Sequence, residues 1–117
     1  MIKPRDPSEL AEDLVHRSIC AVQVAAVIAD KDGIFSWGWN HVGSGYGTHA
    51  ESHAIQRANK QRLHGATIYV AARRQRTTNP ITAKPCEDCQ RLIDKWQLKV
   101  KWRDPSNQWQ SIGETAE

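Results

Sequence analysis

The sequence predicts an α/β protein in which helices cover both faces of a mixed β-sheet. Three observations predict this class. Helix-periodic and strand-like segments alternate along the chain. The most apolar segment, residues 19–29, is β-branched and nearly continuous, as in a strand covered on both faces. The chain has 117 residues, which suits one compact domain. We therefore expect a single domain over residues 1–117.

The first half of the chain predicts a helix, a hairpin and a second helix. Residues 8–17 begin with a capping serine and carry apolar side chains at helical spacing. The strand at residues 19–29 is followed by an Asp-Gly turn and by a second alternating strand at residues 34–40. A glycine-rich loop at residues 43–47 then leads into a helix expected from about residue 48 to residue 63.

The second half predicts a strand, a helix and a final hairpin. Residues 66–72 form the strand, and the polar, proline-containing residues 73–84 form a loop. Proline opens the helix expected at residues 85–96. The strands at residues 98–102 and 108–112 flank a short turn, which predicts that they pair antiparallel.

The composition of the chain argues against several classes of protein. No apolar stretch approaches the ~20 residues that span a bilayer, and the N-terminus lacks a secretory-type apolar segment, so we expect a cytoplasmic protein that does not enter a membrane. Three cysteines, two of them in a C-x-x-C pair, indicate a metal or redox site more than a disulfide framework. The net charge of +3 is too small to indicate nucleic-acid binding by itself.

Two short motifs, distant in the sequence, carry the chemistry. The first is His-Ala-Glu at residues 49–51, and the second is Pro-Cys-Glu-Asp-Cys at residues 85–89. Each has an ordinary structural explanation when taken alone. Glu51 could complete a capping box with Thr48, and the two cysteines could be a redox pair or simply buried thiols.

Together the motifs predict a catalytic zinc site. Such a site takes three protein ligands and keeps a fourth position for water, and His49, Cys86 and Cys89 form an accepted ligand set. Cysteines three residues apart share one helix face, and a helix start favours their thiolate form. Glu51, close to the ligands but not one of them, would transfer protons. We expect one zinc ion per chain.

These motifs resemble the zinc-binding signature of the cytidine/deoxycytidylate deaminase family. The resemblance extends to Gly-Trp-Asn at residues 38–40, to residues 66–70 and to the order of elements, from about Cys20 to Ile112. It implies a three-layer α/β/α cytidine-deaminase-like fold with a five-stranded mixed sheet and the zinc between the second and third helices. The activity that it implies is hydrolytic deamination of a nucleobase with release of ammonia.

The resemblance also implies roles for single residues. The side chain of Asn40 matches a position that contacts the sugar or the base, although asparagine at this point is equally typical of a turn. The backbone N–H of Ala50 is expected to bind the carbonyl oxygen of a cytosine, with Glu51 as the catalytic proton carrier. Relatives commonly assemble, so a homo-oligomer is expected.

The substrate is less well determined. We favour a small molecule, a cytosine nucleoside or nucleotide (cytidine, deoxycytidine or dCMP), because the chain is short and weakly charged. The family markers disagree about the branch. The predicted antiparallel last strands look like the free-cytidine branch, whereas Gly-Trp-Asn at residues 38–40 and the missing glycine after Cys86 look more like the nucleotide and tRNA branch. The alternative is a deaminase that takes an unpaired cytosine or adenine from single-stranded DNA or RNA. A catalytically silent, zinc-stabilised binding module is a third hypothesis, which the presence of Glu51 disfavours. The basic segment Arg73–Arg76 could hold a 5′-phosphate, follow a longer strand or be a solvated loop.

Packing explains the remaining notable side chains. We interpret Cys20 as a small buried side chain and His53 as a packing or surface residue. Trp37 and Trp39 share one face of a strand, where core packing accounts for them. Base stacking on Trp39, next to Asn40, is the alternative.

Overall fold

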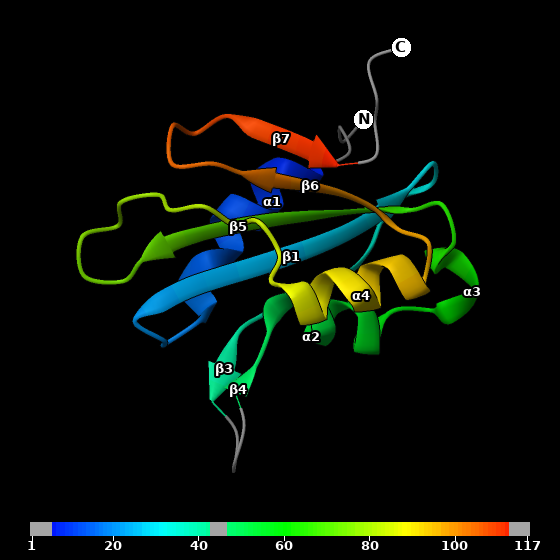
Figure 1. Ribbon diagram of the computed structural model, residues 1–117, viewed down its shortest axis with the longest axis horizontal. Helices are drawn as coiled ribbons and strands as arrows, with labels where there is room; N and C mark the ends of the chain where they lie inside the picture. The colour runs from blue at the N-terminus through cyan, green and yellow to red at the C-terminus, as the bar shows by residue number, and fades with distance from the viewer. Residues whose placement is uncertain (1–5, 43–46, 113–117) are drawn as a thin grey trace, which may run out of the picture.

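The sheet that the sequence predicts is present in the computed structural model, which describes residues 6–42 and 47–112. Its strands lie in the order β2-β1-β5-β6-β7 (Figure 1). The β5–β6 pair is parallel and the other pairs are antiparallel, so the sheet is mixed. The strands are β1 (Val22–Asp30), β2 (Gly33–Trp39), β5 (Thr67–Arg74), β6 (Lys99–Arg103) and β7 (Trp109–Ile112).

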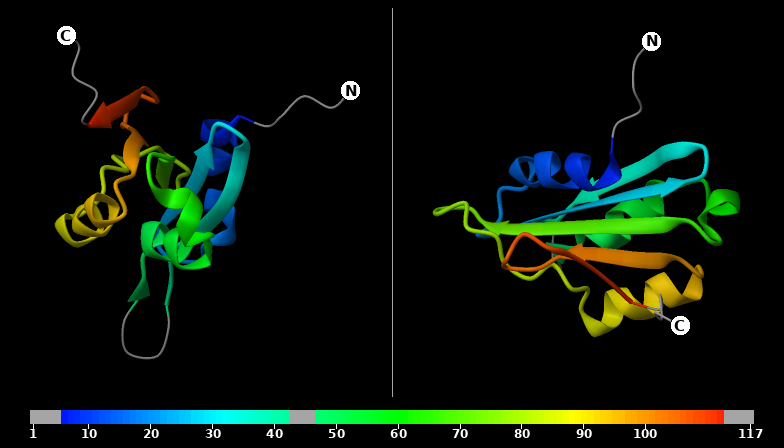
Figure 2. Two further views of the ribbon diagram at one scale, coloured as in Figure 1. Left: turned by 90° about the vertical axis from the view of Figure 1, so that its right-hand side faces the viewer. Right: turned by 90° about the horizontal axis from the view of Figure 1, so that it is seen from above.

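Helices cover both faces of this sheet and complete the three layers (Figure 2). One face carries α1 (Pro7–Leu14), which continues into a 3₁₀ turn, η1 (Val15–Arg17). The other face carries α2 (Ala50–Arg57), α3 (Lys60–Leu63) and α4 (Glu87–Lys95). The predicted α/β/α fold is therefore confirmed. No helix in the described part of the chain is long and apolar enough to cross a membrane.

The central strand β1 explains the continuous apolar run in the sequence. Alternate side chains such as Ala26 and Ile28 join the core under α2 and α4. The intervening side chains, such as Ala25 and Val27, join a smaller core under α1. Because layers cover both sides of β1, none of these residues needs to be polar.

Several predicted boundaries were wrong. The strand expected from residue 19 begins at Val22, and Ile19 is 79% exposed. The helix expected over residues 48–63 is two helices, because the chain is extended at Ala58 and the side chain of Asn59 accepts a hydrogen bond from the Gln61 N–H to start α3. Strand β5 continues to Arg74, into the predicted loop, because its last residues pair with the beginning of β1. Part of the predicted glycine-rich loop is also regular.

That regular part is a small hairpin, in which β3 (His41–Val42) pairs with β4 (Gly47–Thr48). The other residues of the predicted loop, 43–46, lie outside the described residues. The hairpin leads directly from the end of β2 to the start of α2 (Figure 1).

The expectation that Trp37 and Trp39 pack in the core was also wrong. Strand β2 lies at the edge of the sheet, and it is Ser36 and Gly38 that are buried. Trp37 is 38% exposed, with the Arg57 guanidinium 5.5 Å from its ring centre. Alternation in the sequence identified a shared face, but the helix on that side, α1, packs mainly on β1 and β5.

Gly38 sets the distance between β2 and α2. A Cβ atom at this position would lie 2.6 Å from the backbone nitrogen of Ala54 and 2.9 Å from the Cβ of His53. Only glycine lets the helix lie this close to the strand. This contact, together with the hydrogen bond from the Ser36 hydroxyl to the Ala54 carbonyl oxygen (2.6 Å), fixes the helix whose first residues belong to the site described next.

Candidate active site

Two helix starts bring the predicted metal ligands together. His49 is the extended residue immediately before α2, and Cys86 is the extended residue immediately before α4. Cys89 lies in the first turn of α4 and is buried. The Nδ1 atom of His49 lies 3.6 Å from the Sγ atom of Cys86 and 3.3 Å from that of Cys89.

The cluster has the dimensions and the donors of a zinc site. Zinc–sulfur and zinc–nitrogen bonds of about 2.3 and 2.0 Å at tetrahedral angles separate neighbouring donors by about 3.5 Å. The three donor atoms lie within 4.8 Å of one another. Among the described residues, no other group of three histidine, cysteine or acidic side chains brings its donor atoms as close together. His49 and Cys86 are exposed while Cys89 is buried, so the cluster is open on one side.

Glu51 lies beside this cluster and is almost fully buried, with 5% of its surface exposed. Burial raises the pKa of its carboxyl group above the usual range, an effect that its own backbone N–H and the nearby His49 partly oppose. Burial also raises the pKa of the Cys89 thiol, with the Glu51 carboxylate as the second cause. A cation between the ligands would offset both desolvation costs.

The capping-box explanation of Glu51 is not what the structure has. His49, not Thr48, occupies the N-cap position of α2, and its side chain accepts no capping hydrogen bond from the helix. The first N–H groups of a helix have no partner inside the helix. At Ala50, the first residue of α2, such a group borders a cavity.

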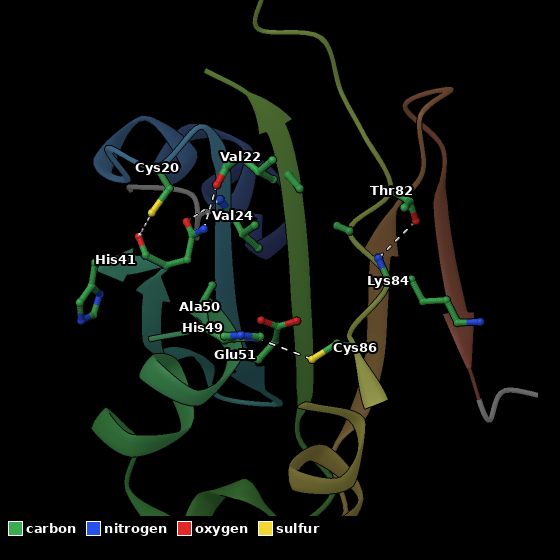
Figure 3. A pocket seen from close by; sticks show the side chains of 13 residues that line it. Cys20, Val22, Val24, His41, His49, Ala50, Glu51, Thr82, Lys84 and Cys86 are labelled. Carbon is green, nitrogen blue, oxygen red and sulfur yellow. Dashed lines mark hydrogen bonds between the residues drawn. The ribbon is translucent and has the colours of Figure 1, made fainter. Parts of the chain in front are cut away.

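The cavity has a volume of about 330 Å³, at the lower end of the range for small-molecule sites. Glu51 and His49 lie on one wall of it, and Cys86 faces them (Figure 3). Sequence reasoning missed most of the remaining wall. The tertiary fold brings its residues together: β1 pairs with β5, and the loop before α4 is held beside the sheet by the hydrogen bond from the Ala83 N–H to the Arg103 carbonyl oxygen (3.0 Å). These wall residues are Cys20, Val22, Val24, His41, Ala72, Thr82 and Ala83.

Asn40 joins the cavity wall to the start of β1. Its Oδ1 atom accepts a hydrogen bond from the Val24 N–H (2.9 Å), and its Nδ2 atom donates one to the Val22 carbonyl oxygen (2.8 Å). The side chain therefore has a structural role, but it links two strands rather than stabilising a turn. An amide carries two hydrogens and two lone pairs on oxygen, so one of each is left for a ligand.

The basic segment at residues 73–76 does not line the cavity. Arg73 lies on the opposite face of β5 and donates a hydrogen bond to the Gln23 side chain (2.7 Å). Lys84 borders the cavity, but its ammonium group points away from it (Figure 3) and lies 5.9 Å from the centre of the Trp102 ring. Within the described residues, the interior of the cavity thus has no arginine or lysine head group.

The other histidine and cysteine near the site have structural contacts. His53 packs edge-on against the rings of Trp39 and His41, with ring centres 5.3 and 4.9 Å away, which agrees with the packing role expected for it. The Cys20 thiol contacts the Asn40 carbonyl oxygen at 3.9 Å and stays apart from the metal cluster.

The sequence itself matches the family profile described as "Cytidine and deoxycytidylate deaminase zinc-binding region" over residues 5–101. The chain belongs to the cytidine and deoxycytidylate deaminase family. The family's zinc-binding region contains the His49–Cys86–Cys89 cluster, and this agreement fits one zinc ion per chain. No match was found among curated proteins.

Several solved structures share the fold. The dCMP deaminase of cyanophage S-TIM5 is 24% identical, with a TM-score of 0.66 over 84% of this chain and 79% of that one. The cytidine deaminase of Burkholderia pseudomallei is 19% identical, with a TM-score of 0.71 over 91% and 88% of the two chains. Acinetobacter baumannii RibD is 28% identical, with a TM-score of 0.55, but the match covers only 27% of it and 84% of this chain.

Proposed function

We propose that this family member catalyses the zinc-dependent hydrolytic deamination of a cytosine nucleoside or nucleotide to the uracil form, with release of ammonia. One observation carries the proposal: a buried carboxyl group, Glu51, borders both the zinc cluster and a cavity of single-base size. A purely structural zinc site has no use for such an arrangement. In support, the cyanophage dCMP deaminase has been solved in complex with dCMP and dUMP.

The protein side chains divide the chemistry among them. Zinc held by His49, Cys86 and Cys89 would supply Lewis-acid activation of a water molecule. The Glu51 carboxylate accepts one proton from the attacking water and delivers it to the ring nitrogen. It then accepts the second proton from the hydroxyl group now bonded to the ring carbon and delivers it to the departing amine, so that the carbon–nitrogen bond breaks and a carbonyl forms. Glu51 suits this role by its position, since it is buried beside the three ligands and borders the cavity.

Two polar groups of the wall would orient the base. The N–H of Ala50 donates to the carbonyl oxygen of the cytosine, where the positive end of α2 favours the partial negative charge. The free amide hydrogen of Asn40 binds the sugar or the base. Because its other hydrogen bonds fix the amide to β1, this contact would come from a rigid group.

The charges of the cavity favour a neutral base and sugar inside it. A phosphate would have to remain at its mouth, since no cationic head group of the described residues reaches the interior. The antiparallel β6–β7 pair, which resembles the free-cytidine branch, supports the same preference. We further propose that the chain acts as a single domain in the cytoplasm, where thiols stay reduced for metal binding, and that it forms homo-oligomers.

A substrate panel on the zinc-loaded protein tests the function. Ammonia release and the cytosine-to-uracil absorbance change are measured with cytidine, deoxycytidine and dCMP. Glu51→Gln should lower kcat by at least about 10²-fold, as expected for loss of a general acid–base, with one zinc ion per chain retained. Glu87→Gln is the matched control, since Glu87 is exposed on α4 and pairs with Arg91. Equal turnover in wild type and Glu51→Gln would refute the role of Glu51. If these small substrates fail, uracil or inosine formed in single-stranded DNA or RNA would favour the alternative deaminase. The silent binding module is favoured only if those strands also fail to react and zinc removal unfolds the chain.

A further inference from the structure

One part of the cavity wall is a loop segment that lies between two strands. The parallel pairing of β5 with β6 stops before either strand ends, and residues 81–83, here called the wall segment, lie between the two ends (Figure 3). The Ile81 N–H donates to the Ala72 carbonyl oxygen (3.2 Å), and the Ala83 N–H donates to the Arg103 carbonyl oxygen (3.0 Å). The wall segment lines the cavity together with Ala72, so this wall depends on the ends of both strands.

The side chain of Arg103 holds the same strand end from the other face of the sheet. Arg103 follows Trp102, which packs on the core under α2 and α4, and successive side chains of a strand point to opposite faces. On the face that α1 covers, the Nη2 atom of Arg103 donates to the Ala72 carbonyl oxygen (3.2 Å). Its Nη1 atom lies 3.5 Å from the carboxylate of Glu12 on α1. The Ala72 oxygen thus accepts hydrogen bonds from both the guanidinium group and the wall segment.

Glu12 keeps the guanidinium group in place. One of its carboxylate oxygens contacts Arg103, and the other accepts a hydrogen bond from the Trp109 Nε1–H (3.2 Å). Trp109 is the residue of β7 that pairs with Arg103. A continuous set of contacts therefore connects α1, through Glu12 and Arg103, with a carbonyl group at the wall of the cavity.

Stability alone does not account for an arginine at this position. Arg103 is only 8% exposed, and its Nε–H is buried without a hydrogen-bond partner among the described residues. A buried donor that stays unpaired lowers the stability of the fold, and apolar side chains of similar volume are often as stabilising as a buried ion pair. A group that is unfavourable for folding and contacts the wall of a binding cavity indicates a functional constraint.

We propose that Arg103, oriented by Glu12, is a positioning residue that fixes the wall segment and thereby sets the affinity of the cavity for its substrate. The wall segment contains neither the metal ligands nor Glu51. Its displacement should therefore weaken binding of the ground state and of the transition state alike, which raises KM and leaves kcat unchanged. The effect on substrate affinity rests on the deaminase function proposed above, whereas the fixing of the wall segment does not.

The variant Arg103→Met tests this proposal, since methionine fills similar space without a hydrogen-bond donor. The Ala72 carbonyl oxygen keeps its bond from the Ile81 N–H. The Glu12 carboxylate keeps its bond from Trp109. Because no buried group loses its last partner, the midpoint of urea unfolding should stay equal or rise. Glu12→Gln is a second variant, which weakens the hold on the guanidinium group from outside the cavity.

Amide hydrogen exchange, followed by NMR on the zinc-loaded protein, reports on the wall segment directly. In Arg103→Met the N–H groups of Ile81 and Ala83 should exchange at least about tenfold faster, the factor for loss of one hydrogen bond to a charged group. The N–H of Lys99, at the other end of β6, should not change. With the best substrate of the panel, KM should rise by a similar factor and kcat should be retained. A general loss of folded protein would instead lower the apparent kcat and leave KM unchanged.

Two comparisons show whether the effect passes through one guanidinium group. Glu12→Gln should raise KM less than Arg103→Met does, and it should have no further effect in the Arg103→Met background. Arg62→Gln is the matched control, because it breaks an ion pair with Asp30 at the other end of β1. It should change neither KM nor the exchange of the wall segment.

The outcomes separate this inference from the proposed function. Unchanged exchange at Ile81 and Ala83 in both variants would show that Arg103 does not fix the wall segment, and the proposal is then wrong whatever the activity. Faster exchange with an unchanged KM would refute the effect on substrate affinity. Additive effects of the two substitutions on KM would contradict the orienting role of Glu12. Faster exchange in a protein that turns over no substrate would support the fixing of the wall segment and count against the proposed function instead.

Discussion

Gly38→Ala tests whether the close contact between β2 and α2 positions the active site. The new Cβ would lie 2.6 Å from the Ala54 nitrogen, and ordinary van der Waals contact begins at 3.4 Å. Strand and helix must therefore separate by about 0.8 Å at this point. Because both partners are backbone or nearly so, no flexible side chain can absorb the movement.

The expected loss of stability follows from overpacking. Extra methyl groups in well-packed regions cost about 1–3 kcal/mol. With an unfolding entropy of about 2.1 cal/mol/K per residue, a chain of 117 residues loses about 4–12 °C in Tm for that cost. The same movement displaces His49 and Glu51 at the start of α2, and a misplacement near 1 Å can lower kcat by up to about 10²-fold.

Calorimetry, zinc content and kcat with the best substrate of the panel are the assays. Gly65→Ala is the control, since a Cβ there meets nothing within 4 Å and the only strain is the positive φ of 82°; it should lose stability but keep kcat. Alanine in a strand interior is otherwise about 0.5–1 kcal/mol better than glycine. A Gly38→Ala protein with unchanged kcat and equal or higher Tm would therefore refute the positioning argument.

Three further predictions concern the metal, the cavity wall and pH. Cys89→Ser should reduce zinc content below one ion per chain and make the Tm insensitive to a chelator; full zinc occupancy by atomic absorption would contradict the ligand assignment. Asn40→Ala removes two hydrogen bonds to β1 and should lower the unfolding free energy by about 1–3 kcal/mol in urea titrations, whereas unchanged stability would argue against its structural role. Arg62 lowers the pKa of Asp30 from 3.8 to about 2, so the ion pair stabilises the fold above about pH 4 and this contribution is lost as the pH falls towards 2. The stability difference between wild type and Arg62→Gln should accordingly shrink over that interval, and a difference that stays constant down to pH 2 would contradict the linkage.

Local patterns in the sequence predicted the order of the main elements well. Hydrophobic periodicity and turn residues identified the β1–β2 and β6–β7 hairpins, because these signals depend on neighbours in the chain. The break at Asn59 was missed because a side-chain cap inside a helical pattern competes with helix continuation only when tertiary packing allows it. The extension of β5 to Arg74 was missed because a partner distant in sequence supplies its hydrogen bonds.

In the candidate site, too, the features set by residue chemistry were predictable and those set by long-range packing were not. Ligand chemistry and spacing predicted the convergence of His49, Cys86 and Cys89, since the donor set itself restricts the possibilities. The walls of the cavity were not predictable, because small apolar residues such as Val24 and Ala72 carry no signal of their own and meet only through strand pairing. The exposure of Trp37 likewise depends on the edge position of β2, which alternation in one strand cannot reveal.

The placement of the ligands at two separate helix starts has a consequence for how the protein responds to its surroundings. His49 is 37 residues from Cys86 and 40 from Cys89, so a shared ion acts as a cross-link, and closing a loop of that length restricts the denatured chain by about 4 kcal/mol in the chain-entropy treatment. Unlike a disulfide, this cross-link is not broken by cellular reductants, and its formation depends instead on the concentration of free zinc. In metal-starved cells the protein would therefore be cleared by proteases sooner, and its abundance would follow zinc availability.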